Sequence, residues 1–193
     1  MENYKKQFAE FLVSAEALQF GEFTLKSGRV SPYFFNSSNF NTGPMIEQLG
    51  QYYASAIQKH APDCSLVFGP AYKGIPLCVT VATVLSKKLN RNIGYFFNRK
   101  EIKTHGDQGI LVGQLPQPGD MAVMVDDVFT DGHTKIESVA LVRELCKIEF
   151  SGVMVLWTVW KAAPAARTQL LNLSAKQGFQ YGQSSPSERY AFI

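Results

Sequence analysis

Residues 121–137 combine a buried strand, an acidic pair, a short loop and a helix in one continuous stretch. The apolar run Met121–Val125 is typical of a strand buried on both faces of a parallel sheet. Asp126 and Asp127 follow it, where that strand is expected to end. Beyond a loop that contains Gly132, apolar residues recur at helical spacing. The stretch therefore predicts a strand–loop–helix unit with two carboxylates at the end of its strand.

The loop in this unit has the composition of a phosphate cradle. Its backbone N–H groups and the positive end of the helix dipole are expected to point at one spot, and Gly132 lets the backbone approach a ligand closely. Thr130 and Thr134 flank that glycine with hydroxyl groups. Carboxylates such as Asp126 and Asp127 suit sugar hydroxyls and water-bound Mg²⁺. A ribose phosphate bound with Mg²⁺ fits this combination; the alternative is an ordinary turn with solvated aspartates.

Composition indicates an ordinary globular domain. The chain has 193 residues, of which 46% are hydrophobic and 18% charged, and this balance argues against disorder. The formal net charge of +3 is too small to indicate a nucleic-acid partner. We find no apolar run of membrane-spanning length and no signal-peptide pattern, so we expect a cytoplasmic protein. Cys64, Cys78 and Cys146 form no CxxC pair and are interpreted as reduced thiols rather than metal ligands.

Strands and helices alternate along the chain, which predicts a single α/β domain over residues 1–193 with a mainly parallel central sheet. Residues 1–40 are expected to contribute a small hood that contains a hairpin. The predicted strands are 65–68, 94–97, 121–125 and 152–157, and the predicted helices are 5–18, 45–59, 75–89 and 164–173. Ligands of such sheets bind at the carboxyl ends of the strands.

Two further loops are expected at that edge of the sheet. Residues 69–74 form a second glycine loop after a strand, with Lys73 as a cation, although a plain connection is the alternative. Residues 98–113 are polar, basic and punctuated by glycine, and they predict a long mobile loop that acts as a lid. A solvated charged loop is the alternative for this second segment.

Four segments carry a resemblance to type I phosphoribosyltransferases, and among these to orotate phosphoribosyltransferases. They are Leu25–Asn36, Phe68–Pro76, Phe97–Gly113 and the acidic stretch 121–137. The resemblance implies transfer of ribose 5-phosphate from phosphoribosyl diphosphate to orotate, which gives orotidine 5'-phosphate and diphosphate in pyrimidine biosynthesis. It also implies Mg²⁺ as cofactor and a homodimer in which the lid of one subunit closes over the site of the other.

The same resemblance implies roles for individual residues. The expected catalytic residues are Lys103, His105, Asp126 and Asp127, and the two aspartates are also expected to hold Mg²⁺ through water. The orotate site is expected at Lys26, Phe34, Phe35 and Thr130. The residues expected to bind phosphoribosyl diphosphate are Tyr72, Lys73, Arg99, Lys100, Lys103, His105, Asp126, Asp127, Val128, Phe129, Thr130, Asp131, Gly132, His133 and Thr134.

The sequence departs from the family pattern at three places. Asp131 and His133 replace small residues of the phosphate loop. Thr158 and Val159 stand where the family has an Asp-Arg pair whose arginine grips orotate, and the region after Pro164 does not match. Three functions stay open at this point: an active orotate phosphoribosyltransferase, a non-catalytic nucleotide-binding relative, and a phosphoribosyltransferase for another base.

We predict weak orotate affinity, because Val159 offers no charge to the orotate carboxylate. A lost charge-assisted hydrogen bond costs about 1.5–3 kcal/mol, which is roughly ten- to a hundredfold in binding. The change Val159→Arg should therefore lower the Kd for orotate at least severalfold in a direct titration. Tight binding by the wild type, unchanged or weakened by the substitution, would mean that another residue such as Lys26, Lys161 or Arg167 grips the carboxylate.

Overall fold

A sheet of five strands lies at the centre of the structure, a computed structural model that describes residues 3–24, 28, 30–103, 109–129 and 133–158. The strand order is β5-β4-β3-β6-β7. The elements follow one another as α1 (Asn3–Ser14), β1 (Leu18–Thr24), β2 (Val30–Phe35), the 3₁₀ helix η1 (Ser37–Asn39), α2 (Gly43–His60), β3 (Leu66–Gly69), α3 (Gly74–Leu89), β4 (Gly94–Lys103), β5 (Gly109–Gly113), β6 (Met121–Phe129), α4 (His133–Cys146) and β7 (Glu149–Thr158).

The central sheet is mainly parallel. Strands β4, β3, β6 and β7 run in the same direction, and β5 pairs antiparallel with β4 at one edge. In the middle strand, Leu66, Val67 and Phe68 are fully buried, as expected for a parallel strand with helices on both sides. The predicted α/β class with a mainly parallel sheet is confirmed.

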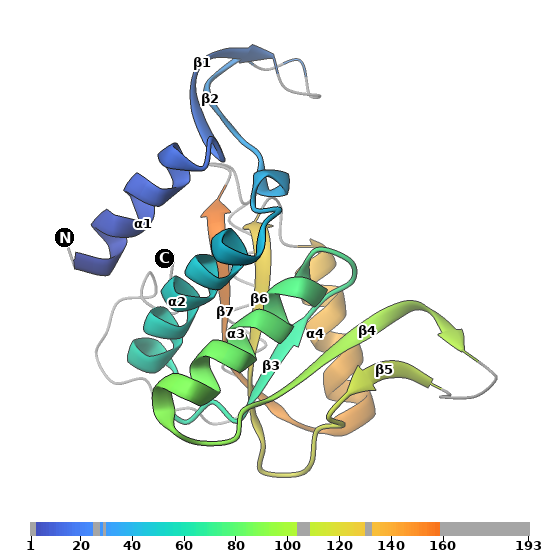
Figure 1. The fold of residues 1–193 in the computed structure, drawn as a ribbon. Helices are drawn as coiled ribbons and strands as arrows, with labels where there is room; N and C mark the ends of the chain where they lie inside the picture. The colour runs from blue at the N-terminus through green and yellow to red at the C-terminus, as the bar shows by residue number, and fades with distance from the viewer. Residues whose placement is uncertain (1–2, 25–27, 29, 104–108, 130–132, 159–193) are drawn as a thin grey trace, which may run out of the picture.

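Helices cover both faces of this sheet. Successive strand residues point to opposite faces, so Val67 and Val123 pack in one hydrophobic cluster with α1, α2 and α3. Phe68 and Met124 pack in a second cluster with residues of α4. Figure 1 shows α2 and α3 in front of the sheet and α4 behind it. The carboxyl end of β6 therefore lies between two differently built layers.

The β1–β2 hairpin stands beyond the carboxyl ends of β6 and β7 (Figure 1). Its strands pair antiparallel, which confirms the predicted hairpin. The short helix η1 leads from it toward α2. The Thr42 side chain caps α2 by accepting a hydrogen bond from the Met45 N–H at 3.4 Å, and Pro44 occupies the first turn, where its missing N–H is harmless. The helix start predicted there is confirmed.

The N-terminal helix is shorter than the predicted span of 5–18. Helix α1 ends at Ser14, and Leu18 already begins β1. Between them Glu16 has a φ of 54°, in the left-handed region through which a right-handed helix cannot continue. Phe8 and Leu12 still face the core as the helical spacing predicted, each with 2% of its surface exposed.

The structure corrects the predicted loop at residues 98–113. Strand β4 continues through Lys103 and β5 begins at Gly109, so most of this segment is an antiparallel hairpin with Asn98 opposite Leu111. The hairpin extends away from the other strands of the sheet (Figure 1). Two strands that pair with each other satisfy their own backbone hydrogen bonds, and a polar sequence with little apolar content therefore still forms them.

Two of the three cysteines are buried free thiols, Cys64 and Cys78, while Cys146 is partly exposed. Burial raises the pKa of Cys64 to about 11 and that of Cys78 to about 12. Both therefore stay protonated at neutral pH and behave as small core residues.

In the part of the chain that the structure describes, no helix is long and apolar enough to cross a membrane. The helix predicted at 164–173 and the tail after it lie outside the described residues.

Candidate active site

The acidic pair lies inside the last part of β6 rather than after it. The strand continues to Phe129, and Asp126 stands opposite Val155 of β7. Because side chains alternate along a strand, Asp126 shares the face of Met124 and α4, whereas Asp127 faces α3 and the start of α2. The two neighbouring carboxylates therefore meet different partners.

Asp127 belongs to a closed triangle of polar groups. The Ser37 hydroxyl donates to Asp127 Oδ2 at 2.6 Å, and Lys73 Nζ lies 3.0 Å from the same oxygen. Lys73 also donates to Ser37 Oγ at 2.8 Å. Burial alone would raise the pKa of Asp127, but the hydrogen bonds from Ser37 and Lys73 and the Lys73 charge lower that pKa below its usual value. The triangle joins η1, the start of α3 and β6.

Asp126 is held from both sides of the sheet. Lys135 Nζ of α4 lies 2.6 Å from Asp126 Oδ2. On the opposite face, the hydroxyl of buried Tyr53 in α2 donates to the Asp126 backbone carbonyl at 2.7 Å. Burial raises the pKa of Asp126 above its usual value, although the ion pair with Lys135 acts in the other direction. Main chain and side chain of this one residue are thus fixed separately.

The loop between β3 and α3 brings Lys73 to the acidic pair. A Cβ atom on Gly69 would lie 2.0 Å from the Gly74 carbonyl oxygen, so this turn closes only because a glycine occupies position 69. The Asn98 side chain accepts a hydrogen bond from the Ala71 N–H at 3.2 Å and links the loop to β4. Lys73 ends the loop with 61% of its side chain exposed, so it can reach a ligand as well as Asp127.

Some of the residues predicted to bind the diphosphate come together around this loop. Lys100 Nζ of β4 lies 5.3 Å from the centre of the Tyr72 ring, a cation–π contact, and Tyr72 is otherwise exposed. Arg99 instead donates to the Gly109 carbonyl at 3.0 Å across the hairpin. Lys100 therefore lies beside Tyr72, in the loop that also carries Lys73, and Arg99 helps to hold the hairpin.

The two predicted base-site phenylalanines do not lie side by side. Phe34 packs on Phe23 of the same hairpin with ring centres 5.6 Å apart and is 40% exposed. Phe35 packs against the cluster under α1 and α2. Alternation along β2 separates neighbouring residues in this way, so of these two rings Phe34 is the more open to a ligand.

Several predicted site residues are described only in part or not at all. Val128 is half-buried in β6. Lys103 ends β4, Phe129 ends β6, and His133 and Thr134 begin α4. Lys26, His105, Thr130, Asp131, Gly132 and Val159 lie outside the described residues.

Sequence reasoning missed Ser37, Tyr53 and Lys135. Lys135 did carry a signal, because it lies in the first turn of α4, where the helix dipole disfavours a cation. A lysine at such a position calls for a nearby carboxylate. Ser37 and Tyr53 carried no comparable signal, since a serine near a turn and an aromatic residue on a helix usually serve packing and solvation.

Comparison with known proteins identifies the family. The chain is 42% identical over 181 residues to the orotate phosphoribosyltransferase of Clostridium botulinum (strain Eklund 17B), and the match covers 93% of this chain and 81% of the relative. The chain belongs to the orotate phosphoribosyltransferase family. Its similarity to the orotate phosphoribosyltransferase of Haemophilus ducreyi is 48% identity over 155 residues, 80% of this chain and 71% of the relative. A scan against protein-family models finds no match.

Solved structures of the orotate phosphoribosyltransferase family share this architecture. The enzyme from Francisella tularensis matches with a TM-score of 0.67 at 42% identity, over 77% of this chain and 69% of its own. An orotate phosphoribosyltransferase from Mycobacterium tuberculosis matches with a TM-score of 0.66 over 84% of this chain and 90% of its own, at 23% identity, which shows the fold alone. The chain therefore has the type I phosphoribosyltransferase fold.

We predict that Ser37→Ala destabilises the protein by about 1.5 kcal/mol at pH 7, since a hydrogen bond to a charged group contributes about 1.5–3 kcal/mol and Ser37 is half-buried. Asp127 has a lowered pKa, so its contacts stabilise the fold above the unfolded-state value of about 3.9 and are lost as the pH falls through the folded-state pKa. Urea unfolding at pH 7 and pH 3 should show the difference shrinking in acid.

The neighbouring change Ser38→Ala is the matched control, because Ser38 is exposed and its backbone N–H, not its side chain, donates a hydrogen bond to the Asn36 side chain. It should leave the unfolding free energy within about 0.5 kcal/mol of the wild type. Equal effects of the two alanine variants, or a Ser37→Ala effect that is independent of pH, would contradict the role assigned to the Asp127 triangle.

Proposed function

We propose that this protein is an active orotate phosphoribosyltransferase that transfers ribose 5-phosphate from phosphoribosyl diphosphate to orotate, giving orotidine 5'-phosphate and diphosphate in pyrimidine biosynthesis. The observation that carries the proposal is the acidic pair at the carboxyl end of β6, whose Asp127 contacts Lys73 of the β3–α3 loop at 3.0 Å. This arrangement occurs in a chain of the orotate phosphoribosyltransferase family.

The acidic pair is suited to a ribose. Carboxylates accept hydrogen bonds from hydroxyl groups and repel phosphate, so Asp126 and Asp127 bind the sugar and leave the charged ends to other groups. Lys73 is exposed and its ion pair with Asp127 is partly solvated, so exchanging one anion for another costs little. In the proposed complex Lys73 turns toward the diphosphate, and Asp127 becomes free for a ribose hydroxyl.

The same carboxylates fit a Mg²⁺ ion that arrives with the substrate. Mg²⁺ keeps several waters and usually takes one or two carboxylates together with substrate phosphates. Among the described residues no group of three or more His, Cys, Asp or Glu side chains that could hold a metal ion occurs. Asp126 and Asp127 would hold it through water. The ion would neutralise charge on the departing diphosphate.

The β4–β5 hairpin supplies the remaining cations of the proposed site. Arg99 and Lys100 lie on β4, and Lys103 ends that strand. As the leaving diphosphate gains negative charge and the ribose centre becomes oxocarbenium-like, fixed cations around it lower the barrier, most strongly where water is excluded. We propose that residues 98–113, with Lys103 and His105, act as a lid that closes over the site of a second subunit in a homodimer.

The base is proposed to bind under the hood. Phe34 is an exposed ring of the β1–β2 hairpin, as is Phe20, and Lys26 belongs to the connection between the same two strands. An aromatic face and a cation suit a planar base that carries a carboxylate. The proposed compartment is the cytoplasm, where the free thiols of the chain would stay reduced.

An absorbance assay of orotate consumption tests the proposed function directly. Purified protein is mixed with phosphoribosyl diphosphate, Mg²⁺ and orotate, and a panel of other nucleobases is run in parallel. We expect turnover with orotate and its loss on addition of a chelator. Turnover with another base alone would identify a different phosphoribosyltransferase, and no turnover with any base would support a non-catalytic nucleotide-binding protein.

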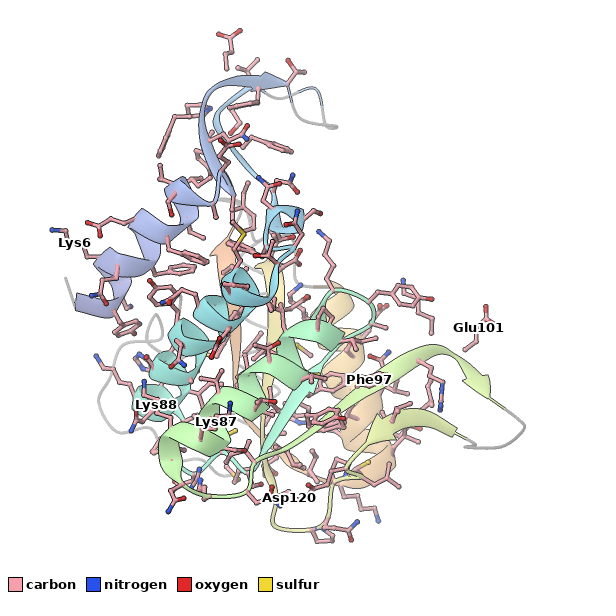
Figure 2. The ribbon with its side chains drawn as sticks, viewed as in Figure 1. Lys6, Lys87, Lys88, Phe97, Glu101 and Asp120 are labelled. Carbon is pink, nitrogen blue, oxygen red and sulfur yellow. The ribbon has the colours of Figure 1, made fainter. Side chains whose placement is uncertain are left out.

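We predict that Lys103→Ala lowers kcat far more than it weakens binding of phosphoribosyl diphosphate, because a lid cation acts on the charge that develops in the transition state. Steady-state kinetics and a calorimetric Kd separate the two quantities. Lys87→Ala is the matched control: this exposed lysine lies in the last turn of α3 (Figure 2), and its loss should change neither. Equal losses of kcat and affinity in Lys103→Ala would mean that the lysine merely binds substrate.

We further predict that mixing the inactive variants Lys103→Ala and Asp127→Asn restores activity. In a dimer with shared sites, one hybrid site receives an intact lid from one chain and an intact acidic pair from the other. The measurement is orotate turnover before and after subunit exchange, with each variant alone as the control. Exchange that is verified by mass spectrometry and returns no activity would refute the shared lid.

A further inference from the structure

Lys135 is a buried cation inside the proposed site that the family resemblance does not assign. Only 7% of its surface is exposed, and its ammonium group lies 2.6 Å from Asp126 Oδ2. Lysine is almost never buried unless it is paired. Its place in the first turn of α4 also sets it against the helix dipole. The ion pair with Asp126 therefore contributes to offsetting two separate costs.

The lysines that hold the two carboxylates differ in their freedom to move. Lys73 has 61% of its side chain exposed and reaches Asp127 from a loop, whereas Lys135 has 9% exposed and reaches Asp126 from a helix packed on the sheet. Withdrawing Lys73 transfers an ammonium group to water. Withdrawing Lys135 would break an ion pair between two largely buried side chains, which is far more costly.

We propose that Lys135 is a positioning residue, which fixes the Asp126 carboxylate in the orientation that meets the ribose while Asp127 changes partners. The inference rests on the proposed function, because it concerns how the acidic pair presents itself to phosphoribosyl diphosphate. Tyr53 supports the same residue at its main chain, through the hydrogen bond of 2.7 Å to the Asp126 carbonyl. With main chain and side chain both held, Asp126 is the stationary member of the pair.

A double-mutant cycle on the affinity for phosphoribosyl diphosphate in the presence of Mg²⁺ tests this assignment. Lys135→Met removes the charge at similar length, and we expect it to weaken binding at least tenfold by calorimetry. In an Asp126→Asn background the same change should cost less than threefold, because there is no longer a carboxylate to orient. A merely structural lysine would instead lower thermal stability and give equal losses of affinity in both backgrounds.

Two further variants keep the test decisive. Lys87→Met repeats the substitution on the exposed lysine at the far end of α3 (Figure 2) and should leave the affinity unchanged. If Lys135→Met fails to fold, Lys135→Arg takes its place: the charge is kept, but the donor geometry changes. Lys135→Arg should weaken binding severalfold in the wild-type background and hardly at all in the Asp126→Asn background. No loss with Asp126 present would overturn the proposal.

Turnover of orotate by the wild type separates this inference from the proposed function. If the wild type turns over orotate but the effects of Lys135→Met and Asp126→Asn on affinity simply add, the proposed function would hold and the role of Lys135 would be refuted. A coupled cycle in a protein that binds phosphoribosyl diphosphate but turns over no orotate would support Lys135 and refute the orotate reaction. A wild type that binds no phosphoribosyl diphosphate would overturn both.

Discussion

The alternation of side chains along β6 is the constraint on which the site depends. Two consecutive carboxylates on a loop would share one environment and repel each other. Within a strand they turn to opposite faces, and the helices on those faces supply a separate cation to each. Lys135 serves Asp126 from α4, and Lys73 serves Asp127 from the start of α3. The three-layer architecture is thus what allows an Asp-Asp sequence to carry two charges at one strand end.

In the ligand-free protein, the negative charges of Asp126 and Asp127 are already each paired with the positive charge of a lysine. A buried carboxylate without a partner costs several kcal/mol, so a site that waited for its substrate to neutralise it would destabilise the free protein. Both aspartates already have a lysine, and Asp127 also has the Ser37 hydroxyl. The two lysines differ in exposure: 61% of the Lys73 side chain is exposed but only 9% of the Lys135 side chain, whereas the two carboxylates are about equally buried. In the proposed complex the ion pair of Lys73 and Asp127 would therefore be the one that exchanges partners, and the ion pair of Lys135 and Asp126 would persist.

The fold followed from the sequence wherever a pattern repeats over many residues. Buried strands and amphipathic helices carry such signals, and those within the described residues were confirmed in kind. The Thr42 cap was recognised from its residue type and was also confirmed. Single-residue conformations and self-paired polar strands were not predictable in this way: Glu16 ends α1 through one left-handed torsion, and the β4–β5 hairpin needs no apolar face. Within the site, the acidic pair and Lys73 were found from their motifs. Lys135 and Ser37 were missed because their partners lie close only after folding, although Lys135 at a helix start carried an electrostatic hint.

The Asp127 triangle also connects the two ends of the reaction that the family performs. Ser37 lies in η1, immediately after the hairpin that carries Phe34, and its hydroxyl contacts both Asp127 and Lys73. In the proposed complex, in which Lys73 turns to the diphosphate, the Ser37 hydroxyl would lose one of its two partners, so binding of the diphosphate would change the contacts at the base of the hood. Such an effect needs no rearrangement elsewhere in the fold. The hood, the acidic pair and the β3–α3 loop all contact one another through the Ser37 hydroxyl group.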